Sequence, residues 1–186
     1  MLQPDEIAPD VPRPIRRAEY ERLVAEGAFE DEKVELLEGV IVTMSPQGPD
    51  HADLVGVLME RLIKMLGDRA TVRVQSSFAA STISEPEPDI SVVPRARYRR
   101  AHPERAFLIV EVARTSRRKD REVKARVYAQ AAVEEYWVVD LVDEAIVVYR
   151  RPEGGSYRDV TTHGRGRAVA VQRFSDVVVS VDELFG

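Results

Sequence analysis

The sequence lacks several residues and patterns on which common enzyme chemistries depend. It contains no cysteine, so disulfides, zinc-thiolate sites and cysteine nucleophiles are excluded. Its three histidines, His51, His102 and His163, do not form a spaced metal-binding pair. No glycine-rich phosphate loop precedes an expected helix, and no apolar run approaches the ~20 residues that cross a membrane. The remaining candidate chemistries are those that depend on carboxylate and cationic side chains.

Length and composition are those of an ordinary globular protein. The chain has 186 residues, of which 44% are hydrophobic and 32% charged, enough for one core without covalent staples. Residues 1–14 contain four prolines and no periodicity, so we expect an extended arm followed by a single domain over 15–186. No basic segment followed by an apolar core opens the chain, and the expected compartment is the cytoplasm.

Charge is distributed unevenly along the chain. The formal net charge is -5, yet residues 95–126 hold twelve Lys or Arg against four acids, and residues 1–60 hold five against fourteen. Such a basic stretch on an acidic protein can guide a polyanion to one site. The alternative is that these cations are solvated partners of the acidic half.

Hydrophobic periodicity predicts a mixed α/β fold. Helices are expected over 16–26, 50–66, 118–132 and 182–185. Strands are expected over 33–44 (two, joined at Glu38-Gly39), 71–77, 90–93, 107–113, 133–140, 145–149, 157–162, 168–173 and 177–180. The order strand, helix, strand over 107–140 favours a parallel pair with a right-handed crossover. The later strands are expected to be antiparallel.

Two carboxylates stand in or beside apolar strands. Glu111 lies inside the run 107–113, and Asp89 opens the run 90–93. Strand packing does not call for a buried acid, so both need another explanation. If the two strands are adjacent, Asp89 and Glu111 are presented together, and the basic residues that follow suggest metal and phosphate chemistry.

Three further residues have both a functional and a structural interpretation. At ~100° per residue, Lys124 falls on or beside the apolar stripe of its helix, so it points inward or along the domain surface, where Asp120 or Glu111 could pair with it. Alternatively, it pairs with Asp120 alone and extends to solvent. Glu35 is either a site residue or an edge-strand carboxylate facing water. His51, at the first turn of a helix, contacts a phosphate or a metal, or is structural.

The order and spacing of these elements resemble a known family. The matching segments are Val34-Glu35-Leu36-Leu37-Glu38-Gly39, His51, Pro88-Asp89-Ile90-Ser91-Val92-Val93, Val110-Glu111-Val112, Asp120-Arg121-Glu122-Val123-Lys124, Tyr128 and Glu135-Tyr136-Trp137-Val138-Val139-Asp140. Together they resemble the bacterial Uma-type family of restriction endonucleases, in the PD-(D/E)xK nuclease superfamily. The resemblance implies a restriction-endonuclease-like core, with a mixed central sheet flanked by helices.

The resemblance also implies site residues. Asp89 corresponds to the aspartate of the Pro-Asp element, Glu111 to the second acid and Glu35 to the N-terminal acid. The usual lysine two residues after the second acid is missing, because Ala113 stands there. The resemblance implies that Lys124 of the following helix replaces it.

The implied chemistry is hydrolysis of phosphodiester bonds. Glu35, Asp89, Glu111 and the main-chain carbonyl of Val112 offer hard oxygen ligands for Mg²⁺ or Mn²⁺. The metal would activate a water and offset charge on phosphorus, and Lys124 would orient the nucleophile or neutralise an oxygen.

The expected partner is nucleic acid, most simply DNA. We expect contacts to its phosphates from four further residues: His51, Arg114, Arg117 and Arg118. Analogy with restriction enzymes implies a homodimer. Two alternatives stay open, a nuclease-fold module without activity that binds nucleic acid or a protein, and a structural oligomer that uses the proline arm and the C-terminal strands.

Overall fold

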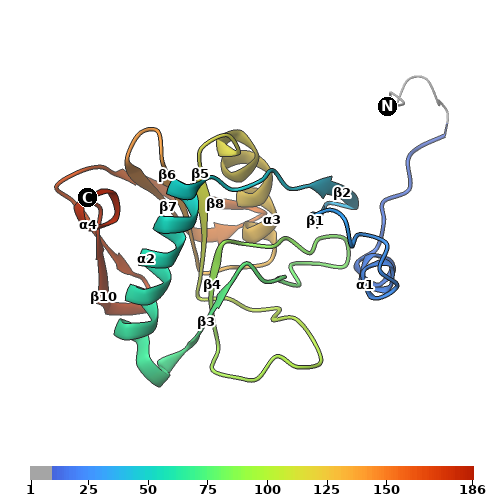
Figure 1. Cartoon of the computed structure of the whole chain (residues 1–186), viewed down its shortest axis with the longest axis horizontal. Helices are drawn as coiled ribbons and strands as arrows, with labels where there is room; N and C mark the ends of the chain where they lie inside the picture. The colour runs from blue at the N-terminus through green and yellow to red at the C-terminus, as the bar shows by residue number, and fades with distance from the viewer. Residues whose placement is uncertain (1–9) are drawn as a thin grey trace.

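The computed structural model of the chain describes residues 10–186 (Figure 1). Residues 1–9 of the expected arm lie outside the described residues, and residues 10–14 contain no helix or strand. Helices are α1 (Arg17–Ala25), α2 (Pro49–Leu66), the 3₁₀ turn η2 (Gly67–Arg69), the π-helix η3 (Lys119–Lys124), α3 (Ala125–Gln130) and α4 (Asp182–Phe185). No helix within the described residues is long and apolar enough to cross a membrane.

A six-stranded mixed sheet forms the centre, in the order β3-β4-β5-β6-β7-β8. Its strands are β3 (Thr71–Val74), β4 (Ile90–Val93), β5 (Leu108–Ala113), β6 (Glu135–Asp140), β7 (Ala145–Glu153) and β8 (Ser156–His163). Strands β5 and β6 are parallel, and every other neighbouring pair is antiparallel. The predicted mixed α/β fold, with its single parallel crossover and added antiparallel C-terminal strands, is confirmed.

Two antiparallel pairs accompany the sheet, β1 (Val34–Leu37) with β2 (Val40–Thr43), and β9 (Ala168–Val171) with β10 (Phe174–Ser180). The first pair turns at Glu38 and Gly39, which both have positive φ, of 49° and 81°. This is the conformation that two-residue hairpins favour and that glycine adopts without strain. A side chain at residue 39 would also meet Pro14, because an added Cβ would lie 2.2 Å from Pro14 Cβ.

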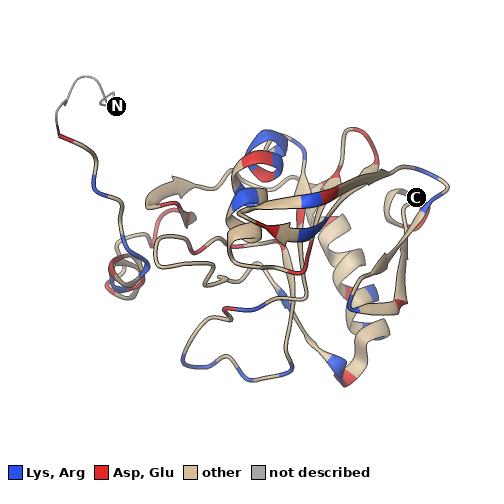
Figure 2. Cartoon of the chain, turned by 180° about the vertical axis from the view of Figure 1, so that it is seen from behind, with Lys and Arg blue, Asp and Glu red and all other residues tan. Residues whose placement is uncertain are grey.

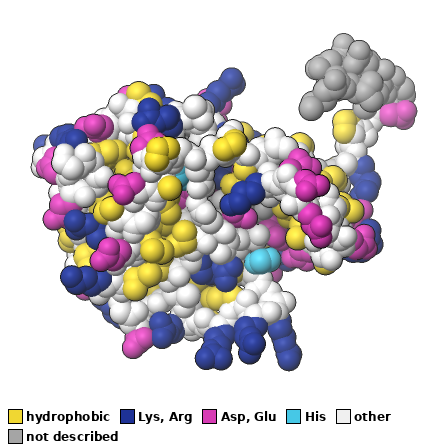
Figure 3. Space-filling view, in the orientation of Figure 1, with side chains coloured by type: hydrophobic (Ala, Val, Ile, Leu, Met, Phe, Trp, Pro, Cys, Tyr) yellow, Lys and Arg dark blue, Asp and Glu magenta, His cyan; other side chains and the backbone are white. Residues whose placement is uncertain are grey.

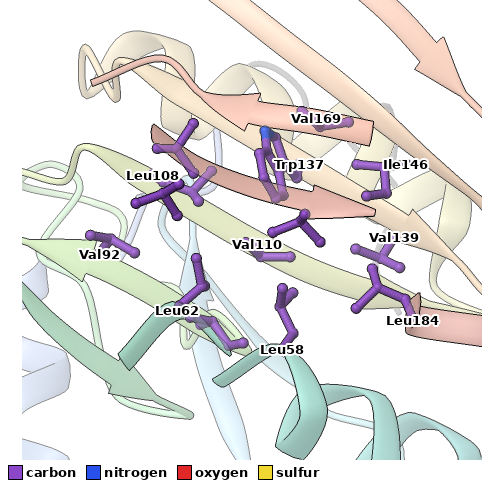
Figure 4. Packing of buried hydrophobic residues seen from close by; sticks show 14 of the residues in the cluster. Leu58, Leu62, Val92, Leu108, Val110, Trp137, Val139, Ile146, Val169 and Leu184 are labelled. Atoms are coloured by element: carbon purple, nitrogen blue, oxygen red, sulfur yellow. The ribbon is translucent and has the colours of Figure 1, made fainter. Parts of the chain in front are cut away.

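The main core lies between the sheet and a layer made of α2 and the C-terminal elements (Figure 4). Leu58 and Leu62 of α2 are fully buried against Val110 of β5, and Trp137 of β6 is also fully buried in this cluster. Burying each such side chain contributes roughly 1.5–3 kcal/mol. This packing fixes α2, and therefore its first turn, relative to the start of β4 and the end of β5.

The opposite face of the sheet is covered by η3 and α3. Alternation along β5 sends Val110 and Val112 into the main core and Ile109 and Ala113 to this second face. Glu111, between Val110 and Val112, therefore points to the second face. That face carries Tyr128 and Tyr136, both fully buried.

The helix predicted over 118–132 is not a regular α-helix. Residues 119–124 form a π-helix, and the amide of Ala125 bonds to the carbonyl of Asp120, five residues earlier. In an α-helix, residues five apart are about 140° apart around the axis. The wider π turn brings such residues nearly into line, so Lys119 and Lys124 face the same side.

The basic residues do not form one face. Strand β4 runs away from Asp89 and β5 runs back toward Glu111, so the connecting loop at 94–107 lies at the far end of both strands. Arginine positions are spaced along that loop (Figure 2), and basic side chains project from the same end of the molecule (Figure 3). Residues 95–126 therefore do not present one basic surface, and only the part from Arg114 onward lies near Asp89 and Glu111.

Candidate active site

A hollow of about 430 Å³ lies where the end of β5 meets the start of β4. Its walls come from the loop at 42–48, the first turn of α2, the segment after β5 and the π-helix. Asp89, Glu111, Val112 and Lys124 all line it. Residues distant in sequence thus meet in one place. Glu35 contacts both Lys119 and Lys124, which line this hollow.

The Asp89 side chain continues the hydrogen bonding between β4 and β5 at the end of the strand pair. Its Oδ2 accepts a hydrogen bond from the Val112 amide at 2.8 Å, where β4 has not yet begun. Its Oδ1 lies 3.0 Å from His51 Nε2 and accepts a bond from Gln47 at 3.3 Å. Asp89 is buried, and burial raises the pKa of its carboxyl above the usual value despite the Val112 and His51 contacts.

Glu111 is buried beside Lys124 and Tyr128. Its Oε1 accepts hydrogen bonds from Lys124 Nζ at 2.8 Å and from the Tyr128 hydroxyl at 2.7 Å. Burial raises the pKa of Glu111 well above its ordinary value, the Lys124 ammonium offsets part of this, and Asp120 and Asp89 raise it further. The site therefore concentrates carboxylates in a poorly solvated space.

Glu35 is fully buried and holds two lysines. Lys119 Nζ lies 2.7 Å from Oε1, and Lys124 Nζ lies 2.9 Å from Oε2. Burial alone would raise the pKa of Glu35, but the two ammonium groups hold it below its ordinary value. The alternative in which Glu35 faces water from an edge strand is wrong.

Lys124 is buried and contacts two acids rather than solvent. Burial favours the neutral amine, but Glu111, Glu35 and Asp120 together raise the pKa of Lys124. The amine is therefore a cation at neutral pH and supplies positive charge rather than acting as a base. The alternative in which Lys124 pairs with Asp120 alone and extends to solvent is wrong.

Sequence reasoning missed Lys119 and treated Asp120 only as a partner for Lys124. Both line the hollow, and Asp120 is buried with a pKa raised by burial. The sequence carries part of the signal for the position of Lys119, because Lys119 and Lys124 are two cations five residues apart. Only the π-helix places both beside Glu35.

The four predicted phosphate-contacting residues differ in their present partners. Arg118 is almost wholly exposed, with a bond to Glu122, and Arg114 is half exposed and paired with Asp50. Arg117 instead pairs with the buried Asp140 at 2.7 Å and with Asp143. His51 is directed at Asp89. Of the four, Arg114 and Arg118 are the ones open to a polyanion.

The donor set fits a divalent cation in chemistry and charge. Among residues 10–186, no group of three His, Asp or Glu side chains is already gathered around one point. The buried acids Glu35, Asp89, Glu111 and Asp120 nevertheless outnumber the adjacent ammonium groups of Lys119 and Lys124, a formal excess of two negative charges when all six groups are ionised. The Val112 carbonyl, on the same strand edge as the Val112 amide bonded to Asp89, adds a neutral oxygen. Hard oxygens with excess negative charge suit Mg²⁺ or Mn²⁺.

Comparison with known proteins assigns the family. The profile of the Uma2 family, described as putative restriction endonucleases, matches residues 17–182. The chain belongs to the Uma2 family. The match includes every predicted site residue, confirms the family resemblance seen in the sequence, and supports nuclease function with nucleic acid as the substrate class.

Solved structures support the fold of this Uma2 protein. It is similar to the crystal structure of a putative nuclease belonging to DUF820 from Anabaena variabilis, with a TM-score of 0.74 and 19% identity over 92% of this chain and 98% of that one. At that identity the likeness shows the fold alone. A search of curated proteins finds no significant match.

Proposed function

We propose that this Uma2 protein is a metal-dependent endonuclease that hydrolyses phosphodiester bonds of DNA. One observation carries the proposal: Asp89, Glu111 and Lys124, from three separate segments, meet in one hollow, with Lys124 Nζ 2.8 Å from Glu111. Two acids and a cation at a strand end form the site that metal-dependent phosphodiester cleavage requires.

Asp89, Glu111 and the Val112 carbonyl are the proposed ligands of Mg²⁺ or Mn²⁺. When bound, the ion would supply Lewis-acid activation of water and neutralise charge on the phosphate. The prediction that Glu35 is also a ligand stays a prediction, since each of its oxygens now accepts a contact from a lysine. We propose that Glu35 acts at least by fixing the two lysines.

The other site residues position the acids and neutralise negative charge. Lys124, kept protonated by its acids, directs a fixed positive charge at a phosphate oxygen or at the attacking water. Tyr128 holds Glu111 in place through its 2.7 Å hydrogen bond. His51 and the Val112 amide hold the two oxygens of Asp89. A site whose side chains are fixed in this way loses little free energy to reorganisation during the reaction.

The substrate would approach along the exposed side of the segment that follows β5. Arg114 and Arg118 lie there, and we propose that they bind phosphates flanking the scissile one. Such contacts position a nucleic acid without reading its sequence. DNA is the proposed substrate, and RNA is tested beside it.

The test is cleavage of labelled single- and double-stranded DNA and RNA with Mg²⁺, Mn²⁺ or chelator. The wild-type protein is expected to cut DNA internally with either metal and to stop in chelator. Asp89→Asn and Glu111→Gln keep side-chain size but lose charge, and should each reduce cleavage by at least ~100-fold. Glu60→Gln, at an exposed position of α2, serves as the matched control and should cut normally.

Retained cleavage in Asp89→Asn or Glu111→Gln would refute the site assignment. Nucleic-acid binding without cleavage by the wild-type protein under all conditions would favour the inactive binding module instead.

A further inference from the structure

A second hollow, of about 320 Å³, lies beside α1 and shares no lining residue with the candidate active site. We call it the acidic hollow. Its walls are contributed by α1, by the segment that leads into β1 and by the loops before and after β4, and they include Tyr20, Glu21, Phe29, Glu85 and His102. Acidic side chains gather over this end of the molecule (Figure 3). Nothing in the proposed nuclease chemistry uses these residues.

Glu85 is the feature of this hollow that needs an explanation. Its backbone is fixed to β1, because the amide and carbonyl of Glu85 both bond to those of Leu36. Its side chain is 4% exposed, and its Oε2 is buried without a hydrogen-bond partner among the described residues. A buried carboxylate oxygen without a partner costs free energy in the folded state.

The groups around Glu85 do not neutralise it. His102 Nε2 lies 3.7 Å from Glu85 Oε1, and burial together with Arg73 lowers the pKa of His102, which disfavours its charged form. Burial and the neighbouring Glu21 raise the pKa of Glu85 to about 7, and the Ser77 hydroxyl and Arg17 offset only part of this.

Arg17 and Lys33, two cations beside this hollow, are paired with acids other than Glu85. Arg17 lies 3.3 Å from Glu104 and 3.6 Å from Glu21, and Lys33 lies 3.3 Å from Glu87. The exposed Glu32 adds a further negative charge at the rim. The hollow as a whole is therefore acidic, with Glu85 at its base.

The remaining wall is aromatic and apolar. Tyr20 and Phe29 pack together with ring centroids 5.9 Å apart, and the Tyr20 hydroxyl is occupied by the Val34 carbonyl at 2.9 Å, so Tyr20 contributes its ring. Val24 adds an exposed apolar edge. Aromatic faces attract cations and accommodate an apolar stem.

We propose that the acidic hollow is a binding site for a guanidinium group on an apolar stem, with Glu85 as its anchoring carboxylate. A guanidinium offers planar N–H donors that match a carboxylate in two-point contact, and its flat face stacks on aromatic rings. The group can belong to a free small molecule or to an arginine side chain. Binding would give the Glu85 carboxylate a cationic partner, which the surrounding residues supply only in part.

The test is calorimetric titration of the full chain at pH 8 in chelator. Agmatine represents a free ligand and N-acetyl-arginine amide an arginine residue, and whichever binds more tightly identifies the source. N-acetyl-citrulline amide, a neutral isostere of the second probe, should not bind. Glu85→Gln keeps the shape of the side chain and should weaken binding roughly ten-fold or more, the loss of one charge-assisted contact. Glu60→Gln should bind as the wild type does.

A second variant keeps the test decisive if Glu85→Gln unfolds. Val24→Arg, at a half-exposed position of α1, places a tethered guanidinium at the hollow and should also weaken binding. The inference is overturned if neither probe binds the wild type at millimolar concentration, or if binding is unchanged in the folded variants. Nuclease activity is not read in this test, so its outcome is independent of the proposed function.

Discussion

Lys124 and Glu111 form a buried ion pair, with Nζ and Oε1 2.8 Å apart and both side chains less than a tenth exposed. One residue comes from the π-helix and the other from the centre of a strand. The pair joins η3 to the sheet and directs the lysine into the hollow that Asp89 also lines.

Replacing Lys124 should reduce both stability and activity. Lys124→Met leaves Glu111 and Glu35 buried without their shared cation, and removing one partner of a buried pair costs about 3–5 kcal/mol. In the double variant Lys124→Met with Glu111→Gln, the loss should be smaller than the sum of the single losses. Urea unfolding of the wild type, the two single variants and the double variant measures the free energy of unfolding of each. Strictly additive losses would show that Lys124 and Glu111 do not interact.

The hydroxyl of Tyr128 should matter for the site and not only for the core. Tyr128→Phe removes the 2.7 Å bond to Glu111 Oε1 and should cost about 1–2 kcal/mol of stability and slow cleavage. Tyr157→Phe is the control, since its hydroxyl bonds the Val133 carbonyl at 3.0 Å, away from the hollow. Equal cleavage rates for the two variants would show that the Tyr128 hydroxyl has no role in cleavage.

Arg117 and Arg118 are adjacent in sequence but should behave differently. Arg118→Ala, at an exposed position, should leave thermal stability unchanged, weaken nucleic-acid binding and reduce the salt dependence of binding by about one phosphate contact. Arg117→Ala leaves the buried Asp140 with one guanidinium fewer and should lower the melting temperature. If Arg117→Ala alone changed the salt dependence, the roles would be reversed.

Glu85 should make stability depend on pH. Its pKa is raised to about 7 in the folded protein from an ordinary value of 4.5, so the folded state holds this proton more tightly than the unfolded state does. The stability that Glu85 gains by holding this proton in the folded state is fully present below pH 4.5 and is lost as pH rises to 7. The unfolding free energy of the wild type should therefore fall relative to that of Glu85→Gln over this range. A difference that is constant with pH would contradict the assignment.

Much of the fold could be predicted because its signals are local. The apolar run of β5, the Glu38-Gly39 turn and the helix that ends before Gly67 each follow from short stretches of sequence. The order of β5, a helix and β6 indicated their parallel pairing. Helical spacing placed Lys124 on or beside the apolar stripe and left two directions open, inward or along the surface, and the structure shows the inward one.

What could not be predicted depends on contacts between distant segments or on local departures from regular geometry. Glu35 is buried because two lysines about ninety residues later close over it. The position of Lys119 follows from a π-helix, which a spacing rule of 3.6 residues does not contain. The division of the basic residues into two groups follows from the direction of β4 and β5, which the charge count along the chain does not show.

The most direct test of the central claim is a calorimetric titration of the apo protein with Mn²⁺. The account predicts saturable binding to the wild type and its loss in both Asp89→Asn and Glu111→Gln, with binding unchanged in Glu60→Gln. Equal Mn²⁺ binding by all four folded proteins would contradict the claim that Asp89 and Glu111 together hold the metal ion.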